Sequence, residues 1–295
     1  MSQTKTILKK IKKLDIKTKQ LVDGIITGNY NSVFKGQGIE FSEIRDYRAG
    51  DDIRAIDWKV TARFNHPYIK EFIEERDLQV YFVIDVSGSG SFGTNISKKE
   101  KSLEIIASLM FAALRNNDGV GVFLVTDNVE KFIPVRKGRK HVLKLLDVIS
   151  NFTPNSAKTS LKTPLERVSQ TIKRKSIVFV ISDFIDNSDY LKPLKILRKR
   201  HDVIALRIID PREKEIPDVG LIELEDEESG EQLLVDTSDE DFRNSYSRLV
   251  AENDSRFLTN MMKNKVDTIS LLTDQNYSIP LKKILQKKVR KNGRI

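Results

Sequence analysis

The stretch Gln79–Ser89, QVYFVIDVSGS, decides the fold class that this 295-residue sequence predicts. Its first seven residues form a nearly continuous apolar run that ends on an acid, Asp85. The stretch Ser176–Asp183, SIVFVISD, has the same pattern. Apolar runs without alternation are typical of strands that helices cover on both faces of a parallel sheet. We therefore predict that both stretches are central strands of such a sheet.

The sequence around these two stretches alternates between helical and strand patterns. Helical spacing recurs at 98–116, 139–151, 161–173, 190–200 and 239–262, and strand-like runs lie at 120–125, 131–135, 202–209 and 266–272. A hairpin is expected near 221–235 and a basic final helix at 277–291. This alternation predicts an α/β fold with a doubly wound, mostly parallel sheet of the Rossmann type.

Residues 1–78 do not share this alternation. We expect an amphipathic helix within residues 4–27, irregular loops from Gly28 to about Gly50, and a short extended segment at 67–73. The stretch from 28 to 78 has few large apolar side chains, too few for a core of its own. We therefore predict that 1–78 packs on a main domain formed by 79–295.

Composition excludes several classes of protein. The chain has no cysteine and only three well-separated histidines, which argues against a disulfide framework and against a thiolate or histidine-rich zinc site. No apolar run approaches the roughly 18–20 residues that span a bilayer, and the N-terminus lacks the apolar region of a signal peptide. We expect a cytoplasmic protein with at most peripheral membrane contact.

The net charge of +9 is concentrated at the two ends of the sequence. Residues 1–20 carry +6 and residues 281–295 carry +7, whereas the 260 residues between them carry −4. Basic ends of this kind favour loose contact with nucleic acid or anionic lipid, or they maintain solubility. They give no support for a basic binding face on the body of the protein.

The residues after the first central strand have several interpretations. Gly88, Gly90 and Gly93 match G-x-G-x-x-G, but Asp85 would repel a pyrophosphate, which disfavours a dinucleotide site. A phospho-aspartate enzyme would need further carboxylates beside Asp85, and Ser87 stands at the position for one. In a third alternative, Asp85 and the serines only cap a loop by hydrogen bonds to the backbone.

A site for a hard divalent cation accounts best for the pattern Asp-x-Ser-x-Ser. One carboxylate and two hydroxyls are oxygen ligands that suit Mg²⁺ or Mn²⁺. Ligands from other loops must complete such a site, and Thr159 and Asp183 are the candidates. Together Asp85, Ser87, Ser89, Thr159 and Asp183 resemble the metal-ion-dependent adhesion site of a von Willebrand factor type A domain.

A second signature lies in the N-terminal segment. It comprises Gly36, Gly38, Glu40, Phe41, Arg45, Tyr47, Gly50, Asp51, Asp52, Arg54, Asp57, Trp58, Ala62, Arg63, Glu75 and Arg76. The string resembles the bacterial family called domain of unknown function 58, whose members join such a segment to a von Willebrand A-like domain. The resemblance covers about residues 28–285. We expect Trp58 to be a core residue, and we interpret the charges as a paired, partly buried structural network of Arg45, Asp51, Asp52, Arg54, Asp57 and Arg63.

The resemblance implies a metal-dependent protein–protein interaction module, an adaptor or chaperone-like partner of a MoxR-type AAA+ ATPase or of its client. No Walker motif occurs and no acid cluster accompanies Asp85, so we expect no enzymatic activity and no small-molecule substrate. An open position on the metal would bind a carboxylate of the partner, which Asn155, Lys158 and Lys162 would help to orient. The alternative is a nucleic-acid or anionic-surface binding protein that acts through its basic termini.

Overall fold

The computed structural model describes residues 38–48, 50–75, 78–93, 96–225 and 230–284. The chain divides into two compact units, with Phe34–Leu78 forming one and the residues from Gln79 onward belonging to the other. The helix predicted within 4–27 and the part of the basic final helix beyond residue 284 lie outside the described residues.

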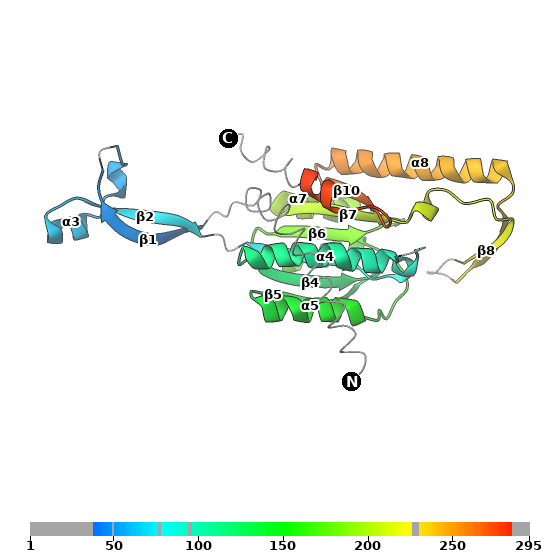
Figure 1. Ribbon diagram of the computed structural model, residues 1–295, viewed down its shortest axis with the longest axis horizontal. Helices are drawn as coiled ribbons and strands as arrows, with labels where there is room; N and C mark the ends of the chain where they lie inside the picture. Colours follow the sequence, from blue (N-terminus) through cyan, green and yellow to red (C-terminus); the bar gives the residue numbers. More distant parts are fainter. Residues whose placement is uncertain (1–37, 49, 76–77, 94–95, 226–229, 285–295) are drawn as a thin grey trace. The chain divides into compact units, whose positions relative to one another are not determined.

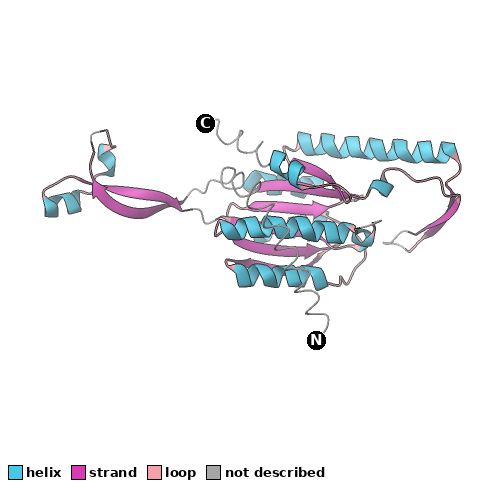
Figure 2. Ribbon diagram, in the orientation of Figure 1, coloured by secondary structure: helices cyan, strands magenta, loops and turns pink. Residues whose placement is uncertain are grey.

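The larger unit is built around a six-stranded sheet (Figures 1 and 2). Its strands are β3 (Gln79–Asp85), β4 (Gly119–Val125), β5 (Val129–Arg136), β6 (Ile177–Ser182), β7 (Asp202–Ile209) and β10 (Asp267–Leu272). The strand order is β10-β7-β6-β3-β4-β5, and only the β4–β5 pair in it is antiparallel. The predicted doubly wound, mostly parallel α/β sheet is therefore confirmed, with β3 and β6 side by side at its centre.

Helices cover both faces of this sheet. They are α4 (Lys98–Arg115), α5 (Arg139–Asn151), α6 (Lys162–Thr171), α7 (Leu191–Arg200) and α8 (Glu240–Lys263). Side chains of β3 point alternately to the two faces: Tyr81 and Val83 join an apolar cluster with α6, α7 and α8. On the opposite face, where Figure 1 shows α4 and α5, Phe82 stacks on Phe179 at 5.3 Å between ring centroids. Burial on both faces explains the continuous apolar runs of the sequence.

Short elements complete the larger unit. The 3-10 turns η3 (Gly88–Ser91) and η4 (Pro211–Glu213) follow β3 and β7. The predicted hairpin is confirmed as β8 (Leu221–Glu225) paired antiparallel with β9 (Gln232–Asp236). Residues 278–284 are helical, as expected for the start of the final helix. In the described part of the chain, no helix is both long and apolar enough to cross a membrane.

The smaller unit is a two-stranded ladder with two short helical turns. Strand β1 (Gly38–Asp46) pairs antiparallel with β2 (Tyr68–Glu75), and η2 (Ile53–Ala55) and α3 (Trp58–Phe64) lie between them in sequence. The prediction of irregular loops up to Gly50 is therefore wrong for β1. A register shift between Phe41 and Glu43 interrupts the apolar alternation of this strand, which hides the strand pattern in the sequence.

Trp58, which the sequence analysis assigns to a core, is 67% exposed. It is the first residue of α3, and Phe64 at the other end of this helix is exposed to the same degree. A seven-residue helix beside two strands offers too little surface to enclose an indole ring. The prediction that residues 1–78 pack on the main domain stays a prediction.

Candidate metal site

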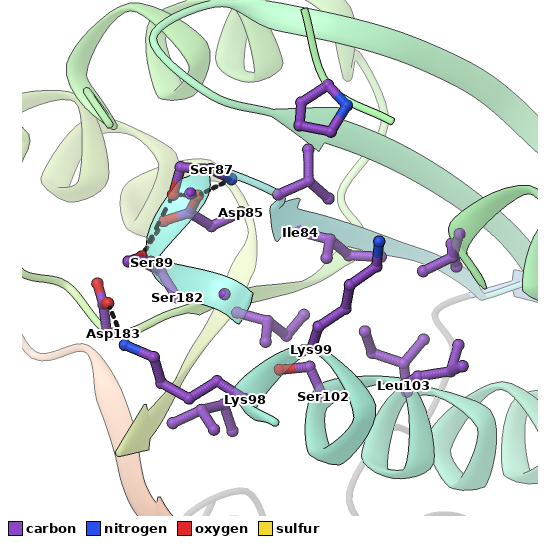
Figure 3. A pocket seen from close by; sticks show the side chains of 18 residues that line it. Ile84, Asp85, Ser87, Ser89, Lys98, Lys99, Ser102, Leu103, Ser182 and Asp183 are labelled. Carbon is purple, nitrogen blue, oxygen red and sulfur yellow. Dashed lines mark hydrogen bonds and ion pairs between the residues drawn. The ribbon is translucent and has the colours of Figure 1, made fainter. Parts of the chain in front are cut away.

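The residues predicted to bind a metal begin where β3 ends (Figure 3). Because β3 and β6 are parallel neighbours, Asp85 and Asp183 reach the same edge of the sheet. The backbone N–H and the hydroxyl of Ser87 both donate to Oδ1 of Asp85, at 3.1 and 2.6 Å. The hydroxyl oxygens of Ser87 and Ser89 are 3.4 Å apart. The Asp-x-Ser-x-Ser spacing thus brings one carboxylate and two hydroxyls together.

Ser182, the last residue of β6, fixes this carboxylate from the neighbouring strand. Its hydroxyl donates to Oδ2 of Asp85 at 2.7 Å and accepts from the backbone N–H of Phe184 at 2.9 Å. Phe184 has a φ of 56°, a left-handed conformation that costs a non-glycine residue about 1–2 kcal/mol. Its buried ring packs against Phe257 of α8 at 5.2 Å between centroids, which holds the turn in place. This turn follows Asp183, whose Oδ1 accepts from the backbone N–H of Ile185.

Lys98 and Glu213 belong to the site, although the sequence pattern of the predicted ligands does not include them. The ammonium of Lys98 lies 2.8 Å from Oδ2 of Asp183 and 2.5 Å from Oε1 of Glu213. The side chains of Lys98 and Asp183 are only 5% and 4% exposed. Burial acts against the charged form of Lys98, but the two carboxylates outweigh it and raise the pKa of Lys98. A lysine is therefore paired with the acid that was predicted to face the metal.

Thr159 reaches the site because its loop is tied to the loops on either side. The backbone N–H of Gly88 donates to the carbonyl of Ala157, and the N–H of Leu161 donates to Asp186 in the loop after β6. Thr159, Ser89 and Asp183 line one open pocket of about 500 Å³. The structure thus brings all five predicted ligands to neighbouring positions at one edge of the sheet.

The electrostatics of Asp85 favour a cation. Burial and the nearby charge of Asp183 together raise the pKa of Asp85 to about 6, although hydrogen bonds from Ser87 and Ser182 act against this rise. A divalent cation would relieve the repulsion between the two carboxylates. Within the described residues, no group of three or more His, Cys, Asp or Glu side chains is placed to hold a metal. Metal binding would therefore depend on the hydroxyl oxygens, which suit Mg²⁺ or Mn²⁺.

The three residues predicted to orient a partner lie around the Thr159 loop. Asn155, Lys158 and Lys162 are exposed. The amide of Asn155 donates to the carboxylate of Glu130 at 2.5 Å, so this side chain anchors its own loop to β5. The two lysines flank the loop, whereas the pocket itself is lined by Asp183, Asp186, Glu213, Glu225 and Lys98.

The charged residues of the N-terminal signature interact over short distances in the sequence. Arg45 donates to both oxygens of Asp51, at 2.8 and 3.0 Å. Asp52 caps η2, and Asp57 caps α3 by accepting from the backbone N–H groups of the first turn. The two remaining members of the predicted network, Arg54 and Arg63, are exposed.

The strand order, with an Asp-x-Ser-x-Ser loop at the end of a central parallel strand, defines a von Willebrand factor A-like α/β protein. The chain belongs to the family described as protein of unknown function DUF58, which matches residues 43–256. An uncharacterized protein of Mycobacterium tuberculosis (strain ATCC 25618 / H37Rv), Rv1480, is 30% identical over 273 residues, covering 90% of this chain and 85% of the relative. YeaD, an uncharacterized protein of Bacillus subtilis (strain 168), is 28% identical over 105 residues, 36% of this chain and 24% of YeaD.

Solved structures with similarity to this chain include two Bacteroides proteins. An aerotolerance-related membrane protein from Bacteroides fragilis NCTC 9343 has a TM-score of 0.48 and 14% identity, covering 72% of this chain and 99% of that one. BatB from Bacteroides thetaiotaomicron has a TM-score of 0.48 and 15% identity, with coverage of 72% and 98%. The von Willebrand A domain of SpRpn10 has a TM-score of 0.39 and 10% identity, with coverage of 72% and 94%. Because these TM-scores lie below 0.5, the fold class is assigned from the strand order of this chain and not from these similarities.

Proposed function

We propose that this protein is a non-enzymatic interaction module that holds Mg²⁺ or Mn²⁺ and uses it to bind a partner protein. The convergence of the Asp85 carboxylate with the hydroxyls of Ser87 and Ser89 carries this proposal. Thr159 and Asp183 line the same pocket as Ser89 and are the further oxygen donors. A bound divalent cation would supply an open coordination position for an oxygen of the partner.

The residues of this chain would position that contact. Ser182 holds Asp85 at a fixed orientation, and the bond from Gly88 to Ala157 holds the Thr159 loop against the Asp-x-Ser-x-Ser loop. Lys158 on that loop and Lys162 at the start of α6 are exposed and would attract a partner carboxylate during its approach. Rigid ligands and exposed steering charges fit reversible recognition of an acidic residue better than they fit catalysis.

We further propose that the partner is a MoxR-type AAA+ ATPase or the client of such an ATPase. Support for this comes from the family, since the chain belongs to DUF58 and carries the N-terminal signature together with the adhesion-site pattern. The protein would then act as an adaptor or a chaperone-like assembly factor.

Calorimetry with Mn²⁺ tests the metal site. Wild-type protein should bind Mn²⁺ with modest affinity, and Asp85→Ala should lose binding because the central carboxylate is removed. Asp189→Ala is the matched control, since Asp189 is an exposed acid that pairs with Lys192 of α7. Equal binding by wild type and Asp85→Ala would contradict the proposal.

Affinity purification tests the function itself. Wild-type protein should recover the partner ATPase or client in the presence of Mg²⁺. This recovery should be lost with EDTA or with Asp85→Ala. In a separate assay, the purified protein should show no ATPase, phosphatase or nuclease activity. Metal-dependent turnover that disappears in Asp85→Ala would contradict the non-enzymatic role. Binding that ignores EDTA and weakens steeply with salt would favour the basic termini as the binding surface.

A further inference from the structure

Lys98 occupies an electrostatically costly place in the fold. It is the first residue of α4, where the partial positive charge of the helix N-terminus disfavours a cation, and its side chain is 5% exposed. Such a lysine needs compensation by acids, and Asp183 and Glu213 supply it from two other loops. The arrangement brings three charged groups to the edge of the candidate metal site.

The contact between Lys98 and Asp183 concerns the same carboxylate that a metal would use. Oδ2 of Asp183 accepts from the ammonium at 2.8 Å, and Oδ1 accepts from the backbone N–H of Ile185 at 3.1 Å. Lys98, Asp183 and Ser89 all line the pocket at the end of the sheet. Figure 3 shows Lys98 reaching Asp183 from α4, next to the loop that carries Asp85 and Ser89. A divalent cation entering this pocket would meet a positive charge already bound to one of its ligands.

We propose that Lys98 is a built-in competitor of the metal, so that its ammonium and a divalent cation compete for Asp183. This inference rests on the proposed metal site and concerns its affinity. Two cations held by one carboxylate in a partly buried site repel each other strongly. Metal binding must therefore draw Asp183 away from Lys98, and the cost of breaking this ion pair lowers the affinity for the metal.

Glu213 provides a second carboxylate for Lys98 when Asp183 binds the metal. It belongs to η4 after β7 and is held in place by the backbone N–H of Asp210, which donates to Oε2. When the metal takes Asp183, Glu213 remains as an acceptor for the ammonium of Lys98. Lys98 can thus loosen its contact with Asp183 without losing every counter-charge, which makes the exchange reversible.

Mn²⁺ binding by charge variants tests this proposal. Lys98→Met keeps an apolar stem of similar length but removes the charged end of the side chain, so the dissociation constant for Mn²⁺ should fall by about tenfold or more. Lys99→Met is the matched control, because Lys99 is the exposed neighbour whose ammonium bonds the carbonyl of Phe152. The dissociation constant of Lys99→Met for Mn²⁺ should lie within about twofold of the wild-type value, since solvent and salt screen an exposed charge.

The outcomes separate the two proposals. Equal dissociation constants for wild type and Lys98→Met overturn the competition while leaving the metal site intact. Absence of Mn²⁺ binding by wild type and by every variant overturns the competition together with the proposed function. If Lys98→Met binds Mn²⁺ more tightly than wild type and adding Asp85→Ala abolishes that binding, both the competition and the proposed metal site are supported.

Two further measurements apply if Lys98→Met folds poorly. The double variant Lys98→Met/Glu213→Gln removes one charge of each sign, and it should still bind Mn²⁺ more tightly than the single variant Glu213→Gln does. In wild-type protein, Mn²⁺ should increase the rate at which an amine-reactive reagent labels Lys98, as mapped by mass spectrometry, with Lys99 unchanged. A double variant no tighter than Glu213→Gln, or a Lys98 labelling rate that Mn²⁺ leaves unchanged, would overturn the competition.

Discussion

The two units of this protein organise their charged residues in different ways. In the larger unit, Lys98 is buried and bonds acids that are 85 and 115 positions away in the sequence. In the Phe34–Leu78 unit, Arg45 bonds Asp51 six positions away, and Asp57 bonds the backbone of its own helix. The first arrangement exists only after the sheet has formed, whereas the second needs only a local turn.

This difference follows from the size of the two units. The six-stranded sheet has helices on both faces, and it encloses polar groups at the ends of its strands, where a charge must be paired to be tolerated. A two-stranded ladder with one short helix encloses little. Asp57 is buried there, but the ion pair of Arg45 with Asp51 is partly exposed and contributes less to stability. Mutations should therefore have much larger effects at the site of the larger unit than in the smaller unit.

The largest effect is expected for Lys98→Met measured without metal. The substitution leaves the buried Asp183 and the partly buried Glu213 without their cation, which should lower the free energy of unfolding by about 3–5 kcal/mol. Urea unfolding in EDTA, followed by circular dichroism, measures this loss. The control Lys99→Met should change the free energy by no more than about 0.5 kcal/mol. Equal stability of the two variants would show that the buried triad is not a structural unit.

A smaller effect is expected for Asp57→Ala. Asp57 accepts from the N–H groups of Lys59 and Val60 at the start of α3, and loss of such a cap costs about 1 kcal/mol. Amide hydrogen exchange in α3, followed by NMR, should become about fivefold faster, which is the equivalent of this loss. A loss as large as that of Lys98→Met would mean that Asp57 takes part in a buried network, as the sequence first indicated.

The accessibility of Trp58 tests whether another part of the chain covers the smaller unit. With 67% of its surface exposed, Trp58 should be quenched by acrylamide nearly as efficiently as a free indole. Strong protection from the quencher would show that another part of the chain covers α3, as the predicted packing of residues 1–78 on the main domain would allow. The single tryptophan makes this reading unambiguous.

The sequence predicts the sheet and the first part of the site because these depend on local patterns. Continuous apolar runs identify β3 and β6, and the Asp-x-Ser-x-Ser spacing places Ser87 beside Asp85 through a bond between near neighbours. Such features require no knowledge of the tertiary structure.

The parts of the site that the sequence did not predict depend on long-range contacts. Lys98 follows a helix cap in a lysine-rich stretch and resembles a surface residue, yet the fold buries it against Glu213. Ser182 is the last residue of an apolar strand, and its role depends on β3 lying beside β6. One signal could have indicated the triad, since a lysine at the first position of a helix is electrostatically unfavourable and calls for a nearby acid.

The smallest effect is expected at Asp51. Hydrogen bonds from the guanidinium of Arg45 and from the backbone N–H of Arg48 lower the pKa of Asp51 to about 2. Because the pKa in the folded state lies below the ordinary value of about 3.9, the pair stabilises the folded protein at pH values above 4. This contribution should decline as the pH falls toward 2, where the carboxylate becomes protonated. NMR titration of the carboxyl carbon should give the low value, and Arg45→Gln should raise it toward the ordinary one. Arg48→Gln is the control, because it retains the backbone bond and should raise the pKa less. If Arg45→Gln left the pKa unchanged, the backbone of the turn alone would hold the charge of Asp51. The smaller unit would then depend on ion pairs even less than the structure indicates.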